Sequence, residues 1–498
     1  MSARESGRIE DDLSNTAARD GARIAVDDGG TLHGWAEIAT RADAFAGELA
    51  LRGLRPGDRV AVFLEKGADA VVALYGAWRA GAIAVPIYEG LKQRQLDYVL
   101  EHSEARFVAT SARRRPLLGA ALARGVVAIE PALAPPLAAK SLPADLPGGA
   151  EPAVILYTSG STGRPKGIVV SHANLAAGAR IVCRYLALRE DDRLLSVLPL
   201  SFDYGLNQLL CCARLGATLV VQRSTFPADV CRTLADRRVT VMAAVPPLWI
   251  QLMGPQSPLA QMELPALRLI TNSGGRLPAQ VVQRYRERFP HVEVVLMYGL
   301  SEAFRSTYLP PSEVDRRPES IGRAIPETEI LVLDAAGRAC APDEVGELVH
   351  RGPTVALGYW RDADATAERF RPDPHGSSGR VVYSGDLVRR DADGFLFFVG
   401  RGDQMIKTQG FRVSAEEVEG HLLASELVAE VAVTAEPDPV AGAALVAHVV
   451  ATERADEPAL RAWCRRELPG YMVPKRFELH AALPRTASGK LDRRALAS

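Results

Sequence analysis

The sequence predicts an α/β protein, with a large N-terminal domain of parallel and mixed sheets flanked by helices and a small, mobile α+β lid domain at the C-terminus. Short β-branched, apolar segments at 59–65 and 82–88 alternate with helix-like stretches such as 68–81. This alternation is typical of largely parallel sheets covered by helices. Open sheets of this kind bind ligands at the ends of their strands, so we expect the functional site there.

The length and a change of character near residue 400 predict where the domains divide. A chain of 498 residues is too long for one ordinary hydrophobic core. Beyond residue 400 it continues through a helix, two strand-like segments, another helix and a basic tail. Gly402 lies between two charged residues and can absorb a backbone rotation. We predict a large domain over 1–400, a hinge over 401–403 and a lid domain over 404–498.

The composition is that of a globular enzyme and argues against some partners. The apolar fraction is 47%, the charged fraction 24% and the net charge −1, so no long-range field would gather nucleic acid or an anionic membrane. The polar residues 1–20 lack the apolar core of a secretory signal, and no run is long enough to cross a bilayer. The six cysteines lack metal-ligand spacing. We expect a cytoplasmic protein with reduced, mostly buried thiols that binds neither nucleic acid nor a membrane.

A phosphate-binding loop is predicted at 157–167, directly after an apolar strand. Its glycines let backbone amides converge on an anion, its hydroxyls add donors, and Lys166 adds a point charge. It is not a Walker loop, because the lysine follows a proline and no GK[ST] occurs. The residues expected to bind phosphate are Thr158, Ser159, Gly160, Ser161, Thr162, Gly163 and Lys166.

The segment 157–167 resembles the phosphate loop of the acyl-adenylate-forming superfamily, which includes acyl-CoA synthetases, adenylation domains of nonribosomal peptide synthetases, and luciferases. The resemblance continues in order along the chain. Residues 298–302 (YGLSE) resemble the family's Tyr-Gly-x-Thr-Glu with serine in place of threonine, 383–386 its ribose-binding segment, 400–412 its hinge segment and 484–490 its C-terminal lysine loop. The chain most resembles free-standing exosortase A system-associated acyl-CoA ligases and stand-alone ligases that load carrier proteins. The resemblance implies the acyl-adenylate-forming fold, whose large domain binds ATP and the acid.

That resemblance implies ATP-dependent activation of a carboxylic acid. The acid attacks the α-phosphorus although both partners are anionic, so the site must neutralise charge and hold the geometry. Glu302 is expected to bind Mg²⁺ and to act catalytically with Lys166, while Asp386 accepts hydrogen bonds from the ribose. Tyr298 is expected to stack on adenine. The other ATP-binding residues that the resemblance implies are Gly274, Gly275, Gly299, Ser301 and Arg401.

Lys490 is the third predicted catalytic residue. The resemblance implies that it swings over the active site during adenylation and is dispensable afterwards. The lid would then rotate about Asp403 and present Gly410, where the missing side chain leaves room for a pantetheine arm. Phe411 and Arg412 would flank this thiol passage.

The acid is expected to enter a pocket that begins at 200–208. Asp203 stands where aspartate pairs with the substrate ammonium in amino-acid-activating relatives, yet aspartate also occurs there in relatives that take acids without an amino group. Arg305 would adjoin this pocket and either grip a second carboxylate or polar tail, or form an ion pair with Asp203. The other predicted wall residues are Tyr204, Asn207, Leu248, Ile270, Asn272 and Met297.

The predicted function is an AMP-forming ligase that joins a small carboxylic acid to a thiol, with ATP and Mg²⁺. The acceptor is coenzyme A or the phosphopantetheine of a separate acyl or peptidyl carrier protein. The first alternative is an amino acid adenylation enzyme that loads a carrier protein in trans. Further alternatives are an adenylate-forming oxygenase of the luciferase kind and a non-catalytic nucleotide or acyl binding protein, and the intact phosphate and lysine loops argue against the latter.

Overall fold

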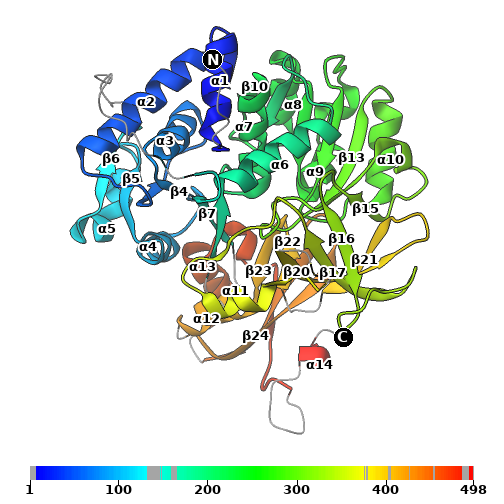
Figure 1. Ribbon diagram of the computed structural model, residues 1–498. Coiled ribbons are helices and arrows are strands. Elements are labelled where there is room, and N and C mark those ends of the chain that lie inside the picture. The colour runs from blue at the N-terminus through cyan, green and yellow to red at the C-terminus, as the bar shows by residue number, and fades with distance from the viewer. Residues whose placement is uncertain are drawn as a thin grey trace.

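The computed structural model describes residues 7–131, 146, 148–158, 165–374, 376, 379–401, 405–425, 427–452, 455–484 and 493–496. Sheets flanked by helices make up most of the chain, and a small sheet with its own helices follows near the C-terminus (Figure 1). This architecture confirms the α/β fold with a smaller C-terminal α+β part that the sequence predicts.

The first sheet carries the strand that precedes the phosphate loop. Its strands are β3 (Arg59–Val62), β4 (Ile83–Pro86), β5 (Ala105–Ala109), β6 (Val127–Ile129), β7 (Pro152–Thr158), β8 (Lys166–Ser171) and β18 (Gly358–Tyr359). Among the described residues their order is β18-β8-β7-β4-β3-β5-β6. Neighbours from β7 to β6 are parallel, whereas β8 pairs antiparallel with both β7 and β18.

The second sheet is parallel in its middle and antiparallel toward both ends. Its strands are β1 (Ile24–Asp28), β2 (Thr31–Gly34), β9 (Arg193–Ser196), β10 (Thr218–Val221), β11 (Val241–Ala244), β12 (Leu269–Asn272), β13 (Glu293–Tyr298), β14 (Thr307–Leu309), β15 (Ser320–Ala324), β16 (Glu329–Leu333), β17 (Val345–Arg351), β19 (Phe370–Pro372), β20 (Arg380–Arg390) and β21 (Leu396–Arg401). In the described part of the chain the order is β16-β17-β20-β21-β15-β14-β13-β12-β11-β9-β10-β1-β2, with β19 beside β20, and the parallel middle runs from β1 to β13. Strands β11 and β12 are buried along their whole length, as expected for parallel strands with both faces covered.

Helices cover both sheets. They are α1 (Glu10–Asp20), α2 (Trp35–Leu51), α3 (Ala68–Arg79), α4 (Gln93–His102), α5 (Gly119–Ala123), α6 (His172–Tyr185), α7 (Asp203–Leu215), α8 (Pro227–Asp236), α9 (Pro246–Leu252), α10 (Ala279–Arg288) and α11 (Ala363–Arg369), with short 3₁₀ turns η1 (Arg115–Leu118), η3 (Pro258–Gln261) and η4 (Pro311–Glu313). Local sequence sets several of their ends. Ser171 caps α6 by accepting from the Asn174 amide, and α7 ends at Gly216, whose φ of 81° suits a residue without a side chain.

The C-terminal part begins with the hairpin of β22 (Met405–Thr408) and β23 (Phe411–Ser414). Its other elements are α12 (Ala415–Leu423), β24 (Val428–Asp438), β25 (Gly442–Ala451), α13 (Glu457–Glu467), η5 (Gly470–Met472), β26 (Arg476–Leu479) and α14 (Arg493–Leu496). In Figure 1 these orange and red elements lie below the blue and green ones. The strand order β24-β25-β26 pairs β24 with β25 antiparallel and β25 with β26 parallel.

Two hydrophobic clusters follow this division. The main cluster takes buried side chains from Ile9 to Leu396, and a separate one runs from Ile406 to Phe477. The exact division at 401–403 stays a prediction, because residues 402–404, including Asp403, lie outside the described residues. All six cysteines are free and buried, as expected. Within the described part of the chain, no helix has both the length and the apolar character needed to cross a membrane.

Candidate active site

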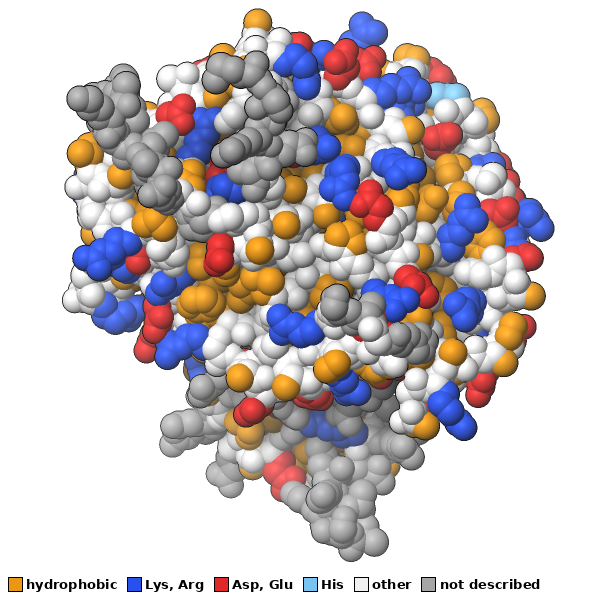
Figure 2. Space-filling view, viewed as in Figure 1, with side chains coloured by type: hydrophobic (Ala, Val, Ile, Leu, Met, Phe, Trp, Pro, Cys, Tyr) orange, Lys and Arg blue, Asp and Glu red, His pale blue; other side chains and the backbone are white. Residues whose placement is uncertain are grey.

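A cleft lies between the large part of the chain and the C-terminal part. From the large part, its lining residues follow the carboxyl ends of strands β4, β7, β12 and β13, where the sequence places the site. From the C-terminal part, Gly410 and Phe411 of the β22–β23 hairpin, Glu417 of α12, and Tyr471 reach into it. Figure 2 shows basic and acidic side chains interspersed over the face of the molecule shown in Figure 1, in keeping with the near-neutral net charge.

The β22–β23 hairpin reaches the cleft with its turn, where Gly410 lies beside Gly274. Gln409 and Gly410, with φ of 52° and 83°, form its two-residue turn, because Thr408 pairs with Phe411. A Cβ added to Gly410 would lie 2.8 Å from Val245, and one added to Gly274 would lie 3.5 Å from Gly410 Cα. The turn therefore packs against Val245, after β11, at a distance that leaves no room for a side chain at position 410, and it also contacts Gly274 after β12.

Tyr298, which lines a cavity that adjoins the cleft, contacts Asp386, 88 positions further along the chain. The Tyr298 hydroxyl donates a hydrogen bond to the Asp386 carboxylate, and both residues are buried. Asp386 on β20 pairs with Arg401 on β21. Only the backbone of Arg401 is described. Lys407 Nζ lies 5.4 Å from the centre of the Tyr298 ring. The predicted adenine-binding and ribose-binding residues thus lie together.

Glu302 and Lys166 both lie close to Tyr359. The Tyr359 hydroxyl donates to Glu302 Oε1 at 2.8 Å, and Lys166 Nζ lies 5.1 Å from the centre of the same ring. Lys166 also lies 4.0 Å from Asp362, a half-exposed contact that contributes little to stability. Tyr359 therefore binds the Glu302 carboxylate through its hydroxyl and lies with its ring near the Lys166 ammonium group.

The predicted acid-binding residues Asp203 and Arg305 form a buried ion pair, one of the two arrangements expected for Arg305. Arg305 Nη1 donates to Asp203 Oδ2 at 3.1 Å, and the side chains are 3% and 7% exposed. Burial raises the pKa of Asp203, against the lowering effect of Arg305. The guanidinium carbon lies 4.7 Å from the centre of the Tyr204 ring. Arg305 Nη2 is buried and donates no hydrogen bond within the described part of the chain.

Not every predicted wall residue lines the cleft. Asn272 and Met297 line an adjoining cavity with Gly274, Gly275 and Tyr298. By contrast, Leu248 and Ile270 pack in the main hydrophobic core, and the Asn207 side chain accepts a hydrogen bond from Cys211 inside α7. These three are not among the residues that line the cleft, because they face inward from their helices and strand.

An aromatic cluster around Phe411 was not predicted. Phe411 stacks on Tyr471 with ring centres 3.8 Å apart and planes 5° apart, and Tyr88 and Phe202 each lie 6.0 Å from Phe411. Buried Glu417 belongs to the same region, and burial raises its pKa to about 7. Tyr88 follows an apolar strand, a signal that points to a strand-end site; Tyr471 carries no such signal.

Several predicted residues lie outside the described residues. The phosphate-loop members among them are Ser159, Gly160, Ser161, Thr162 and Gly163, and the others are Asp403 and Lys490. Thr158, Gly299 and Ser301 are described and line the cleft, while Arg412 is described by its backbone alone.

Comparisons with known proteins identify two families of domains. Residues 13–360 match the AMP-binding enzyme model, and residues 417–490 match the AMP-binding enzyme C-terminal domain. Tyrocidine synthase 3 from Brevibacillus parabrevis is 30% identical over 93% of this chain and 7% of its own length. Novobiocin biosynthesis protein H from Streptomyces niveus is 34% identical over 95% of this chain and 79% of its own length. The chain spans 6–7% of the length of the first three curated relatives that it matches.

Among solved structures, o-succinylbenzoate CoA synthetase (MenE) from Bacillus subtilis is similar in two complexes. A double mutant bound with its product analogue OSB-NCoA has a TM-score of 0.86 at 27% identity, covering 97% of this chain and 98% of that one. The complex with the acyl-adenylate intermediate OSB-AMP has a TM-score of 0.71 at 27% identity, covering 98% of each chain. These matches confirm the resemblance that the motifs carry: the chain belongs to the AMP-binding enzyme family, in the acyl-adenylate-forming superfamily.

Proposed function

We propose that the protein activates a small carboxylic acid with ATP, releases pyrophosphate, and transfers the acyl group from the adenylate to the thiol of coenzyme A or of a carrier protein. The observation that carries this proposal is the β22–β23 hairpin, whose Gly410 packs against the Gly274 loop inside the cleft. Because Gly410 and Gly274 line the cleft without side chains, a slender thiol arm can pass beside them. The proposal places the turning point at 401–403, with Asp403 as hinge.

The first half-reaction needs charge neutralised around ATP and the acid. Tyr298 and Asp386, joined by their hydrogen bond, support binding of adenine and ribose. Glu302 directly follows Ser301, which lines the cleft, and its carboxylate is the kind of oxygen ligand that Mg²⁺ prefers, with one oxygen already oriented by Tyr359. Mg²⁺ held by Glu302 would supply positive charge to the phosphates. Lys166 and the proposed swing of Lys490 add positive charge as the acid carboxylate attacks the α-phosphorus.

The second half-reaction needs an adenylate that is shielded from water until a thiol arrives. The stacked Phe411 and Tyr471 rings, with Tyr88 and Phe202 beside them, line the passage with apolar surface. The higher TM-score to the complex with OSB-NCoA than to the complex with OSB-AMP supports the view that this arrangement belongs to thiol transfer. The thiolate sulfur attacks the acyl carbon, and AMP leaves.

The Asp203–Arg305 pair favours an acid without an amino group. Asp203 already has a cation at 3.1 Å, so a substrate ammonium would have to displace Arg305. Arg305 Nη2, buried with no acceptor among the described residues, points to an oxygen in the tail of the substrate. A charge-assisted hydrogen bond of this kind is worth roughly 1.5–3 kcal/mol. We therefore place the substrate among acids that carry a second carboxylate or a carbonyl.

The test is substrate-dependent ATP–pyrophosphate exchange with three matched panels: amino acids, the same acids without the amino group, and acids with a tail oxygen. The Lys490→Ala protein serves as the blank. We expect exchange with tail-oxygen acids, and in Arg305→Leu combined with Asp203→Asn their apparent KM rises by roughly tenfold or more. The double substitution keeps the buried site neutral, which separates substrate recognition from the cost of an unpaired buried charge.

Two outcomes contradict parts of this proposal. Exchange confined to amino acids would make Asp203 an ammonium anchor and the protein an enzyme that loads a carrier protein in trans. Exchange that never exceeds the Lys490→Ala blank would contradict adenylate formation itself.

A further inference from the structure

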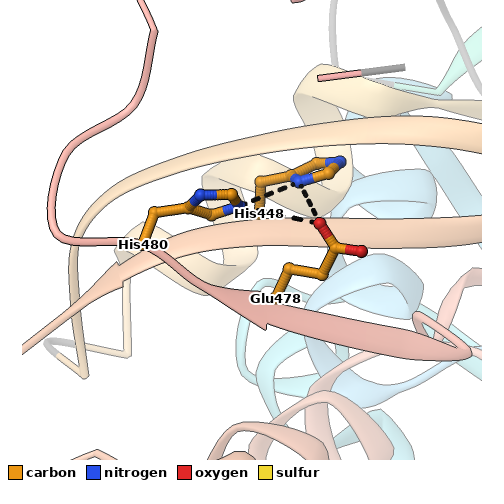
Figure 3. Close-up of side chains that lie close together, drawn as sticks. All are labelled: His448, Glu478 and His480. Atoms are coloured by element: carbon orange, nitrogen blue, oxygen red, sulfur yellow. Dashed lines mark hydrogen bonds and ion pairs between the residues drawn. The ribbon is translucent and has the colours of Figure 1, made fainter. Parts of the chain in front are cut away.

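Three side chains with metal-ligating atoms converge on the C-terminal sheet, away from the cleft residues. His448 on β25 stands directly opposite Glu478 on β26, and His480 follows two positions later (Figure 3). Side chains at positions i and i+2 of an extended segment share a face, which explains why all three meet. We propose that His448, Glu478 and His480 form a binding site for a divalent transition-metal ion, with zinc the ion that the donors fit best.

The donor atoms have the spacing of a zinc site. His448 Nδ1 lies 3.0 Å from Glu478 Oε2 and 3.1 Å from His480 Nε2, and the latter two atoms lie 3.7 Å apart. Zinc bound tetrahedrally at roughly 2.0–2.1 Å from nitrogen and oxygen ligands sets its ligand atoms about 3.3 Å apart. The three atoms therefore approximate one face of a tetrahedron, and the fourth position is left for water or another ligand.

Hydrogen bonds among the three side chains cannot account for all of their close contacts. If the His448 Nδ1 proton is donated to Glu478, it is directed away from His480 Nε2, which lies 3.1 Å from the same nitrogen. His480 Nε2 is 3.7 Å from the carboxylate oxygen, too far for a good hydrogen bond. A cation at the centre is bound by one lone pair from each of the three atoms at once.

Neighbouring groups orient these ligands, as the outer contacts of metal sites do. His448 Nε2 lies 2.9 Å from Thr434 Oγ1, so the ring is held at its far nitrogen while Nδ1 faces the other two ligands. Arg476 Nη1 lies 3.1 Å from Glu478 Oε1, which leaves Oε2 directed at the histidines. Imidazole nitrogen suits zinc and similar ions rather than Mg²⁺, so the Mg²⁺ that accompanies ATP would not compete.

A metal ion at this site would restrain the chain where β26 ends. His480 follows β26 directly, and the chain continues from it toward Lys490. A bound ion would hold the end of β26 against β25 at the root of the segment that carries this lysine. The site itself does not depend on the proposed reaction.

The test is metal binding to the full chain, made without a polyhistidine tag, stripped with a chelator and kept free of ATP. Zn²⁺ affinity is measured by competition with a chromophoric chelator, and Co²⁺ is added in parallel for its visible absorption. We expect a single equivalent of Zn²⁺ per chain, unaffected by excess Mg²⁺, and the intense Co²⁺ absorption of tetrahedral coordination. His480→Ala and Glu478→Gln should each weaken Zn²⁺ binding by at least about 10²-fold.

The matched control is His33→Ala, which removes a histidine that also contacts a carboxylate, Glu37 Oε1 at 2.6 Å, but has no third ligand among the described residues. It should bind Zn²⁺ as the unaltered chain does. Circular dichroism of the metal-free variants checks that they are folded. Zn²⁺ binding in the unaltered chain no tighter than in His480→Ala overturns the site, as does loss of binding in His33→Ala alone.

Discussion

Glu417 is an acidic side chain buried where the C-terminal part meets the large part. Its Oε2 is buried and accepts no hydrogen bond within the described residues. Burial raises the pKa of Glu417 from its ordinary 4.5 to about 7, although Gln95 and Arg94 of the large part act to lower it. Tyr471, whose own pKa is raised by burial, is its other ionisable neighbour. The docked arrangement therefore prefers the protonated carboxyl.

The sign of the pH effect follows from this shift. A pKa that is higher in the docked arrangement makes docking strongest below about pH 4.5, and the advantage is lost as the pH rises to about 7. We expect Glu417→Gln to transfer the acyl group from a preformed adenylate faster than the unaltered enzyme. The ratio of the two rates should grow on the order of tenfold between about pH 5.5 and about pH 8. Ionisation of the acceptor thiol affects both proteins equally, so it cancels in the ratio of their rates. A ratio that does not change with pH would contradict the raised pKa of Glu417 in the docked arrangement.

The β22–β23 hairpin shows how one short element joins the two parts. Positive φ at both Gln409 and Gly410 is what a two-residue hairpin turn of the primed type requires. The same turn places Gly410 against Val245 and Phe411 against Tyr471. Both the turn geometry and the packing in the cleft therefore favour glycine at position 410.

Gly410→Ala should block docking of the hairpin, because the new Cβ would lie 2.8 Å from Val245. We expect ATP–pyrophosphate exchange to continue while thiol transfer falls on the order of 10²-fold or more, since a shift of about 1 Å is enough for such a loss. Gly442→Ala is the matched control, with a φ of 81° against 83° but a nearest atom at 3.9 Å. Equal losses of transfer in both variants would assign the effect to backbone strain rather than to the contact with Val245.

At the scale of the whole molecule, we propose that each arrangement of the two parts serves one half-reaction. The observed arrangement has Gly410, Phe411 and Glu417 in the cleft. It matches the complex with OSB-NCoA at a TM-score of 0.86 and the complex with OSB-AMP at 0.71. A single rotation that exchanges the hairpin for Lys490 would let one cleft perform both steps.

Lys490→Ala tests this division of labour. We expect adenylate formation to fall on the order of 10²- to 10³-fold, because one preorganised charge is lost. Thioester formation from a supplied acyl-adenylate should remain within a few-fold of the unaltered enzyme, as measured by single-turnover kinetics with a thiol acceptor. Comparable losses in both steps would show that the lysine acts in both arrangements.

The fold and the family of this protein could be predicted from its sequence. The features that could not be predicted depend on contacts between distant parts of the chain. The alternation of apolar strands and helices indicated the α/β fold, and the ordered motifs from Thr158 to Lys490 indicated the family. The walls of the acid pocket were harder. Leu248 and Ile270 are core residues, because apolar side chains near a strand end look alike in sequence whether they face a cleft or the interior.

The sequence by itself determined the strands, turns and helix ends, since capping residues, glycines and apolar periodicity act on the chain within a few positions. Only the tertiary structure decided that Arg305 pairs with Asp203 across 102 positions, that Tyr471 stacks on Phe411, and that His448 meets Glu478 and His480. Each of these contacts depends on strand register or on the docking of the two parts. Register and docking result from the packing of the whole core, which no local pattern specifies.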